Sequence, residues 1–198
     1  MKKIALSLIK LLLGLVFLTA AATTQAAETY TLDPSHTYVL WHISHFGFSN
    51  PSGKWFANGT LLLDEANPQN SKVNVTINMA SIDSGIKELD DHLKGKLFFD
   101  VAKYPTATFV SNKVTLTGKN TAKVNGILTL RGIAKPITLD VTLNKTGINP
   151  INNKQTAGFS ATAQLKRSDF DINALLPGLG DDVALNIETE ASKTTTQG

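Results

Sequence analysis

The sequence predicts an all-β protein: an antiparallel up-and-down barrel of about eight strands, with a short helix near residues 85–94. Apolar residues recur at every second position along most of the chain, which is typical of strands with one apolar and one wet face. Short turns separate these strands. A meander of this length leaves open edges unless it closes on itself, which favours a barrel.

The N-terminal segment has the layout of a secretory signal peptide. Two lysines precede an apolar run that extends to Ala22, and a small, polar stretch ends at Ala26. This layout predicts a signal peptide over residues 1–26, and therefore export to the periplasm. Lys10 interrupts the run, which disfavours a retained membrane anchor of about 20 apolar residues.

The remainder of the chain carries no excess of charge. The sequence has 19 basic and 16 acidic residues. Three of the basic residues and none of the acidic ones lie within residues 1–26, so the rest of the chain has 16 of each. This balance gives no electrostatic support for nucleic-acid binding. The chain has no cysteine, which excludes thiol catalysis, thiolate metal sites and disulfides.

Strand patterns follow one another along residues 27–191, the predicted barrel domain. Val73, Val75, Ile77 and Met79 show the alternation most clearly. The other predicted strands cover residues 36–48, 55–64, 106–117, 122–130, 137–143, 157–165 and 183–187. Residues 192–198 lack the pattern and are predicted to be a disordered tail.

One segment departs from the strand pattern. Ile86, Leu89 and Leu93 have helical spacing, and Gly95 follows them as a residue that can end a helix. The sequence therefore predicts a short helix that lies over the barrel or over one of its mouths.

Three of the four histidines lie within residues 36–48. Alternation places His45 on the same face as Trp41, and His36 and His42 on the opposite face. His36 and His42 would be about 20 Å apart at ~3.3 Å per residue, too far to share one metal ion. We therefore predict no metal ligand here. His45 is expected to be either a hydrogen-bonded inner histidine or a polar anchor in an apolar cavity.

Several separated blocks also occur in a characteristic order between about Tyr30 and Glu190. They are Asp91-His92-Leu93, Phe98-Phe99-Asp100, Tyr104-Pro105, Leu128-Thr129-Leu130-Arg131-Gly132, Lys135-Pro136 and Arg167-Ser168-Asp169-Phe170. Together they resemble the YceI-like family of polyisoprenoid-binding proteins. The resemblance implies a lipocalin-like barrel in the periplasm that holds a long amphipathic isoprenoid lipid. It implies no catalytic residue, and no cofactor besides that lipid.

Two positions depart from the family pattern. Lys87-Glu88-Leu89-Asp90 stands where an arginine usually precedes the Asp-His-Leu block, and Asp171 stands where a glycine usually follows the Arg-Ser-Asp-Phe block. The first changes a charge near the helix and the second affects a tight turn. The general role is therefore easier to transfer than the identity of the head group.

The expected ligand is a polyisoprenoid or an isoprenoid quinone, held by apolar contacts along its tail. The residues predicted to contact the tail are Val39, Trp41, Ile43, Phe56, Phe109, Leu128 and Phe159. The residues predicted to contact the head group are His45, His92, Arg167 and Arg131. Arginine offers paired donors to a phosphate, and a neutral histidine can donate to a carbonyl.

Other functions remain open at this stage. A hydrolase or metal-dependent enzyme could use His36, His92 and carboxylates, although adjacent residues such as those of Asp33-Pro34-Ser35-His36 rarely form a catalytic triad. Gly53-Lys54-Trp55 matches the Gly-x-Trp of true lipocalins. A packed barrel could instead bind a protein partner. The sequence leaves a homodimer and transient contact with a membrane or membrane protein open.

Overall fold

The structure, a computed structural model, describes residues 27–194. The predicted signal peptide and the end of the predicted tail lie outside these residues. The strands are β1 (Glu28–Leu32), β2 (Tyr38–His45), β3 (Ser52–Leu63), β4 (Lys72–Asn78), β5 (Thr106–Leu116), β6 (Thr121–Leu130), β7 (Ile133–Ile148), β8 (Gln155–Lys166) and β9 (Leu179–Lys193). The α-helix α1 covers Lys87–Lys94, and short 3₁₀ turns cover Pro68–Asn70, Met79–Ser81 and Arg167–Phe170.

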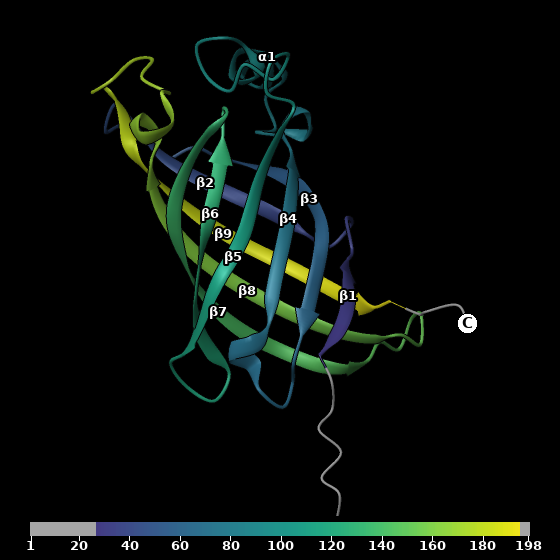
Figure 1. Ribbon diagram of the computed structural model, residues 1–198. Helices are drawn as coiled ribbons and strands as arrows, with labels where there is room; N and C mark the ends of the chain where they lie inside the picture. Colours follow the sequence, from purple (N-terminus) through teal and green to yellow (C-terminus); the bar gives the residue numbers. More distant parts are fainter. Residues whose placement is uncertain (1–26, 195–198) are drawn as a thin grey trace, which may run out of the picture.

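The strands form one closed antiparallel barrel (Figure 1). Each strand from β2 to β9 pairs with the next along the chain, and β9 pairs back with β2. The short strand β1 also lies between β3 and β9, where it extends the position that β2 occupies. The ring therefore has eight strand positions, and the predicted up-and-down barrel is confirmed.

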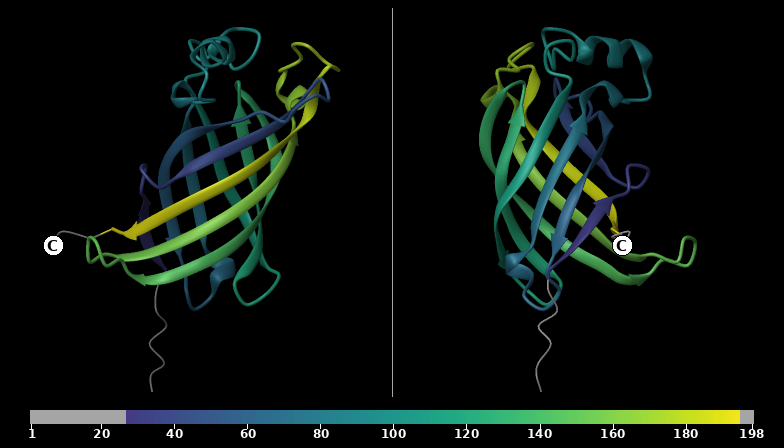
Figure 2. Two further views of the ribbon diagram at one scale, coloured as in Figure 1. Left: turned by 180° about the vertical axis from the view of Figure 1, so that it is seen from behind. Right: turned by 45° about the vertical axis from the view of Figure 1, so that its right-hand side comes forward.

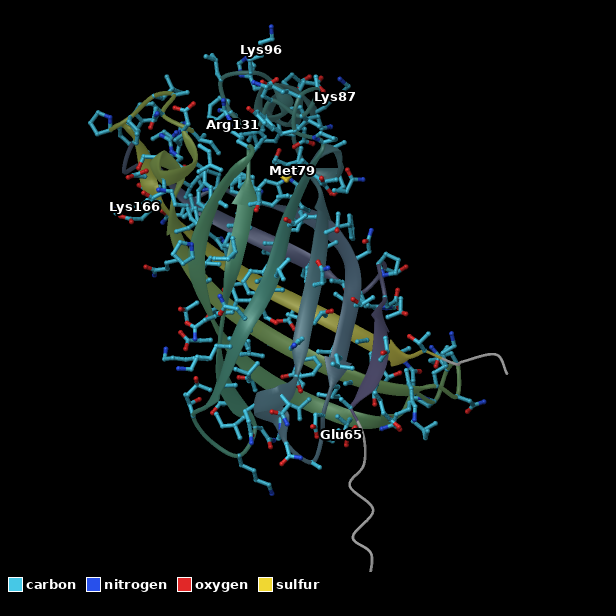
Figure 3. All side chains as sticks on the ribbon, viewed as in Figure 1. Glu65, Met79, Lys87, Lys96, Arg131 and Lys166 are labelled. Carbon is cyan, nitrogen blue, oxygen red and sulfur yellow. The ribbon has the colours of Figure 1, made fainter. Side chains whose placement is uncertain are left out.

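The two ends of the barrel differ. At one end, large apolar side chains fill the interior around Tyr30, whose hydroxyl donates to Glu65 at 3.4 Å. Burial and the Glu65 carboxylate raise the pKa of Tyr30. At the other end, α1 and several loops lie over the barrel (Figures 1 and 2). Figure 3 shows Glu65 at the end opposite Lys87 and Lys96.

The predicted helix is present over Lys87–Lys94. Leu89 and Leu93 pack against the barrel core, as their spacing predicts. The Gly95 amide donates to the His92 carbonyl at 3.0 Å and ends the helix. No helix within residues 27–194 is long and apolar enough to cross a membrane.

Strand β9 is longer than its apolar pattern indicates. Ser192 and Lys193, which the sequence assigned to the disordered tail, pair with Thr31 and Tyr30 of β1. The prediction was wrong at these two residues because the partner strand, rather than the local pattern, supplies the order.

The backbone conformation of Asp171 shows how aspartate can stand where the family usually has a glycine. It adopts a left-handed conformation, with φ 58° and ψ 32°, directly after the 3₁₀ turn Arg167–Phe170. Glycine adopts this conformation most easily, but aspartate tolerates it better than most residues. The Asn173 amide donates to the Asp171 carboxylate at 3.1 Å, so the turn keeps its shape with a charged residue.

We expect Gly126→Ala to destabilise the barrel by about 2 kcal/mol, because overpacking of a closed core forces its neighbours to move. A Cβ at this position would lie 2.5 Å from both the Phe109 ring and the Val110 carbonyl oxygen. Gly158→Ala is the matched control, since a Cβ there meets nothing within 4 Å. Urea unfolding of both variants checks this, and equal stability would contradict it.

Candidate ligand-binding cavity

The barrel contains a cavity of about 820 Å³ at the end covered by α1. This volume lies in the upper part of the range for small-molecule sites. Inward-facing residues of β2, β3, β6 and β9 form its walls, and α1 with the loop that follows it forms its cover. The lining is almost entirely apolar, so the cavity suits a hydrocarbon chain.

Six of the seven predicted tail-binding residues lie inside the barrel, in two groups. Val39, Trp41, Ile43 and Leu128 line the cavity. Phe109 is buried but packs against Gly126, and Phe159 packs against the cluster that fills the opposite end. The last two therefore belong to the solid part of the barrel interior.

The prediction that Phe56 faces the interior and contacts a lipid tail is wrong. It lies on the outer face of β3, where the ammonium of Lys54 lies 5.1 Å from its ring centroid. Its neighbour Trp55 faces inward and lines the cavity. Trp55, Ala57 and Leu61 share the inward face with two glycines, so a period-two signal for this face was present in the sequence.

An aromatic cluster lies directly beneath the cover of the cavity. Trp41 is paired with Gly53 across β2 and β3, and a Cβ at Gly53 would lie 2.5 Å from the Trp41 ring. The ring centroids of Trp41 and Trp55 are 6.2 Å apart. Phe99, from the loop after α1, meets Trp55 edge to face at 5.0 Å. Because Gly53 has no side chain, the Trp41 ring can pack directly against the Gly53 backbone.

Arg167 borders the cavity, but its guanidinium holds a loop in place. It is 4% exposed, and its Nε, Nη1 and Nη2 donate to the carbonyls of Gly180, Ile172 and Leu179 at 2.7, 2.7 and 2.9 Å. Burial lowers the pKa of this guanidinium, and the nearby Asp181 carboxylate opposes that shift. Three of its five N–H donors are therefore used by the backbone.

Arg131 is not among the residues that line the cavity. Its Nη1 donates to the Phe98 carbonyl at 2.5 Å, and its Nη2 lies 3.9 Å from an Asp171 carboxylate oxygen. Figure 3 shows Arg131 at the covered end of the barrel. The side chain thus connects the loop after α1 to the turn that follows β8.

The histidines occupy different surroundings. His45 and His92 line the cavity and are exposed, so they lie at its mouth. His36 lies outside the cavity lining and pairs with Asp33 at 2.7 Å, which raises the pKa of His36 and lowers that of Asp33. The Ser35 backbone amide donates to the Asp33 carboxylate at 2.9 Å.

His36 and His92, the pair suggested for an enzyme, therefore do not share the cavity. Among residues 27–194, no three histidine or carboxylate side chains are grouped closely enough to hold a metal ion.

Exposed apolar side chains surround the mouth. Ile86, Leu97 and Leu175 line the cavity and are also exposed. Phe48, on the β2–β3 loop, is 91% exposed. The Phe46 amide donates to the Gly178 carbonyl at 3.0 Å, which joins the β2–β3 loop to the loop that Arg167 holds.

We expect Arg167→Met to destabilise the protein by about 3 kcal/mol, because the substitution removes the donors to the carbonyls of Ile172, Leu179 and Gly180. Residues 172–180 should become the first site of limited proteolysis. Lys166→Met is the control, since the exposed ammonium of Lys166 forms ion pairs with Asp182 and, at 3.9 Å, with Asp181, and their loss should cost less than about 1 kcal/mol. A stable Arg167→Met variant with an intact loop would contradict the structural role.

A closed antiparallel barrel with one apolar cavity and an open mouth defines a barrel of the ligand-binding class. The sequence comparison is specific: a YceI-like domain matches residues 30–191. The chain therefore belongs to the YceI-like family, and the resemblance found in the sequence is confirmed.

The similar proteins cover most of the chain. Protein YceI of Escherichia coli O17:K52:H18 is 40% identical over 186 residues, which are 91% of this chain and 96% of that protein. A UPF0312 protein of Pseudomonas savastanoi is 41% identical over 169 residues, covering 84% and 86% of the two chains.

Solved structures show the same fold. BcnA of Burkholderia cenocepacia has a TM-score of 0.71 and 27% identity, over 80% of this chain and 98% of BcnA. A polyisoprenoid binding domain from Saccharophagus degradans has a TM-score of 0.62 over 83% of this chain and 98% of that domain. At 14% identity, this second likeness shows the fold alone.

Proposed function

We propose that the protein binds a long isoprenoid lipid within its cavity and shields it from water. The observation that carries this proposal is the apolar cavity of about 820 Å³ inside a closed barrel. A polyisoprenoid binding domain has the same fold, which supports this class of ligand. The mechanism is sequestration, without a chemical step.

The cavity volume limits how much of the lipid is enclosed. A water molecule takes up about 30 Å³ in the liquid, so the cavity has room for roughly 27 groups of that size. A methylene group is of similar size, which corresponds to about five isoprene units. A longer chain would extend through the mouth between Ile86, Leu97 and Leu175.

Each enclosed methylene would contribute about 0.8 kcal/mol before the costs of binding are subtracted. Affinity should therefore rise with chain length until the cavity is full. We propose that this binding takes place in the periplasm, because the N-terminal segment has the layout of an export signal.

Mass spectrometry of an organic extract tests the proposal directly. The mature protein, purified from its native compartment without detergent, should release a near-stoichiometric isoprenoid that is missing from a similarly treated control protein. An empty extract, together with no binding of added isoprenoids, would contradict the proposed function.

A pair of neighbouring residues on β6 tests whether the lipid lies inside. Leu128 lines the cavity, whereas Ile127 lies on the outer face. Leu128→Gln should lower isoprenoid affinity about tenfold, because it places an amide without a partner in an apolar cavity. Ile127→Gln should leave affinity unchanged. Titration of both folded variants measures this, and equal affinities would place the ligand elsewhere.

We also propose that the mouth takes up its ligand from a lipid bilayer. The exposed residues Phe48, Leu97 and Leu175 come from three separate loops around the opening of the cavity. Residues 46–51 and 172–178, two of these loops, carry no charged side chain. Lys96, beside Leu97, supplies an ammonium that can meet lipid phosphates while the apolar side chains insert.

Phe48→Ser combined with Leu97→Ser should slow isoprenoid transfer from vesicles about tenfold, because less apolar surface can enter the bilayer. Equilibrium affinity for the isolated ligand should change little. Ile151→Ser is the control, since Ile151 is 90% exposed on the β7–β8 turn, away from the covered end (Figure 2). Equal transfer rates for the two variants would contradict uptake through this rim.

A further inference from the structure

The β7–β8 ladder stops before it reaches the covered end of the barrel. Its register begins at Asp140 and Thr162 and runs from there toward the β7–β8 turn. Toward the covered end, residues 133–139 of β7 pair with β6, and residues 163–166 of β8 pair with β9. Within the described chain, these two stretches do not pair with each other. The seam is the name used below for the opening between them.

A second pocket, of about 370 Å³, lies in the seam. Residues 135–138 and 164–166 form its two sides, and Phe170 of the 3₁₀ turn after β8 also lines it. Leu165 lines both this pocket and the cavity. Phe170 is 2% exposed and belongs to the core cluster around the cavity. Side chains, rather than paired backbones, therefore close the barrel wall at the seam.

The Lys135-Pro136 block accounts for the seam. Proline has no N–H to donate to a neighbouring strand and is therefore confined to sheet edges. Lys135 is opposite the cavity residue Leu128, so it stands on the inward face of β7. If the β7–β8 register continued, Lys135 would be opposite Arg167, and like charges in that arrangement are destabilising. The block thus keeps the two strands apart.

The seam is the place where the wall can widen most easily. Elsewhere, widening would break the backbone hydrogen bonds of a strand ladder. At the covered end an ion pair spans the seam: Arg131, in the β6–β7 turn, lies 3.9 Å from Asp171, directly after the turn that follows β8. The Asp171 side chain is 70% exposed, and an exposed pair is weak. Asp171 stands where the family usually has a glycine, so this contact depends on a residue particular to this chain.

We propose that the seam is a lateral gate of the cavity. An isoprenoid chain enters and leaves between β7 and β8, and the Arg131–Asp171 ion pair is the latch that holds the gate closed. The inference rests on the proposed function and specifies the route by which the ligand exchanges. Ile137, Leu165 and Phe170 supply apolar side chains along this route.

The position of the gate fits uptake from a bilayer. Figure 3 shows Arg131 and Lys166, which flank the seam, at the covered end of the barrel. The loop that carries the exposed Leu175 follows the turn beside the seam. Insertion of the rim into a bilayer would therefore bring the outer end of the seam to the lipid.

Thr138→Cys combined with Gln164→Cys allows the gate to be locked. The two residues are exposed on opposite sides of the seam, and the chain has no cysteine of its own. A reducible methane bis-thiosulfonate linker, which spans more than a disulfide, joins them. We expect the locked protein to exchange geranylgeraniol with phosphatidylcholine vesicles about tenfold more slowly, at unchanged equilibrium affinity. Reduction of the link should restore the rate.

Thr142→Cys combined with Ser160→Cys is the matched control. These residues are opposite each other in the paired part of the same two strands. A link between them adds the same constraint where the wall is already closed, so the exchange rate should not change.

The latch is tested without a link. Asp171→Asn removes the charge and keeps a residue that tolerates the left-handed backbone, and it should speed exchange about two- to threefold. Raised salt should speed exchange by the wild type but not by this variant, because it screens the same ion pair. Asp140→Asn is the control, since the Asp140 ion pair joins β7 to Lys123 of β6 and does not cross the seam.

The outcomes separate the gate from the proposed function. Equal exchange by the locked and reduced seam variant, or equal slowing by both links, would overturn the gate and leave the lipid-binding barrel intact. Unchanged exchange in Asp171→Asn would overturn the latch. No binding of geranylgeraniol or any longer isoprenoid by the wild-type protein would overturn the proposed function itself.

Discussion

The structure depends on the closure of one sheet. Strands β3 and β4 pair, β2 pairs with β9, and β1 completes the position of β2, so backbone donors and acceptors find partners around the ring. Eight strands enclose a space that side chains can just fill. The size of the inward side chains then decides where the interior is solid. Tyr30 and Leu61 fill one end, whereas the other end holds the cavity, whose lining includes the small residue Ala107.

Arg167 and Arg131 hold the segments around the mouth of the cavity in place through hydrogen bonds to backbone carbonyls. Loop carbonyls lack strand partners, and burial makes an unpaired carbonyl costly. Arg167 satisfies the carbonyl of Ile172 in the loop and those of Leu179 and Gly180 at the start of β9, and Arg131 satisfies the carbonyl of Phe98. These positive charges support the cover of an apolar cavity. The sequence predicted them as head-group contacts because arginine offers paired donors to a phosphate, but their hydrogen bonds go to the protein itself.

The sequence predicted what local patterns determine. Period-two alternation identified the barrel, and the spacing of Leu89 and Leu93 identified the helix. Phe56 was predicted to face inward, but the alternation of Trp55, Ala57 and Leu61 along β3 places it on the outer face. Phe109 and Phe159 were placed on inward faces, but their level along the barrel depends on strand register, which a single strand's pattern does not contain.

The partners of Arg167 were unpredictable for a related reason. They are the backbone carbonyls of Ile172 and of the first two residues of β9, which pass Arg167 only after the chain has turned, and no side-chain motif marks them.

Affinity and selectivity have separate sources in such a cavity. Contacts with an apolar wall grow with chain length and distinguish poorly between lipids of similar length. A buried donor discriminates strongly, because a ligand without an acceptor leaves it unpaired. The apolar wall of the barrel therefore suits any long hydrocarbon chain, and discrimination between head groups requires a polar contact.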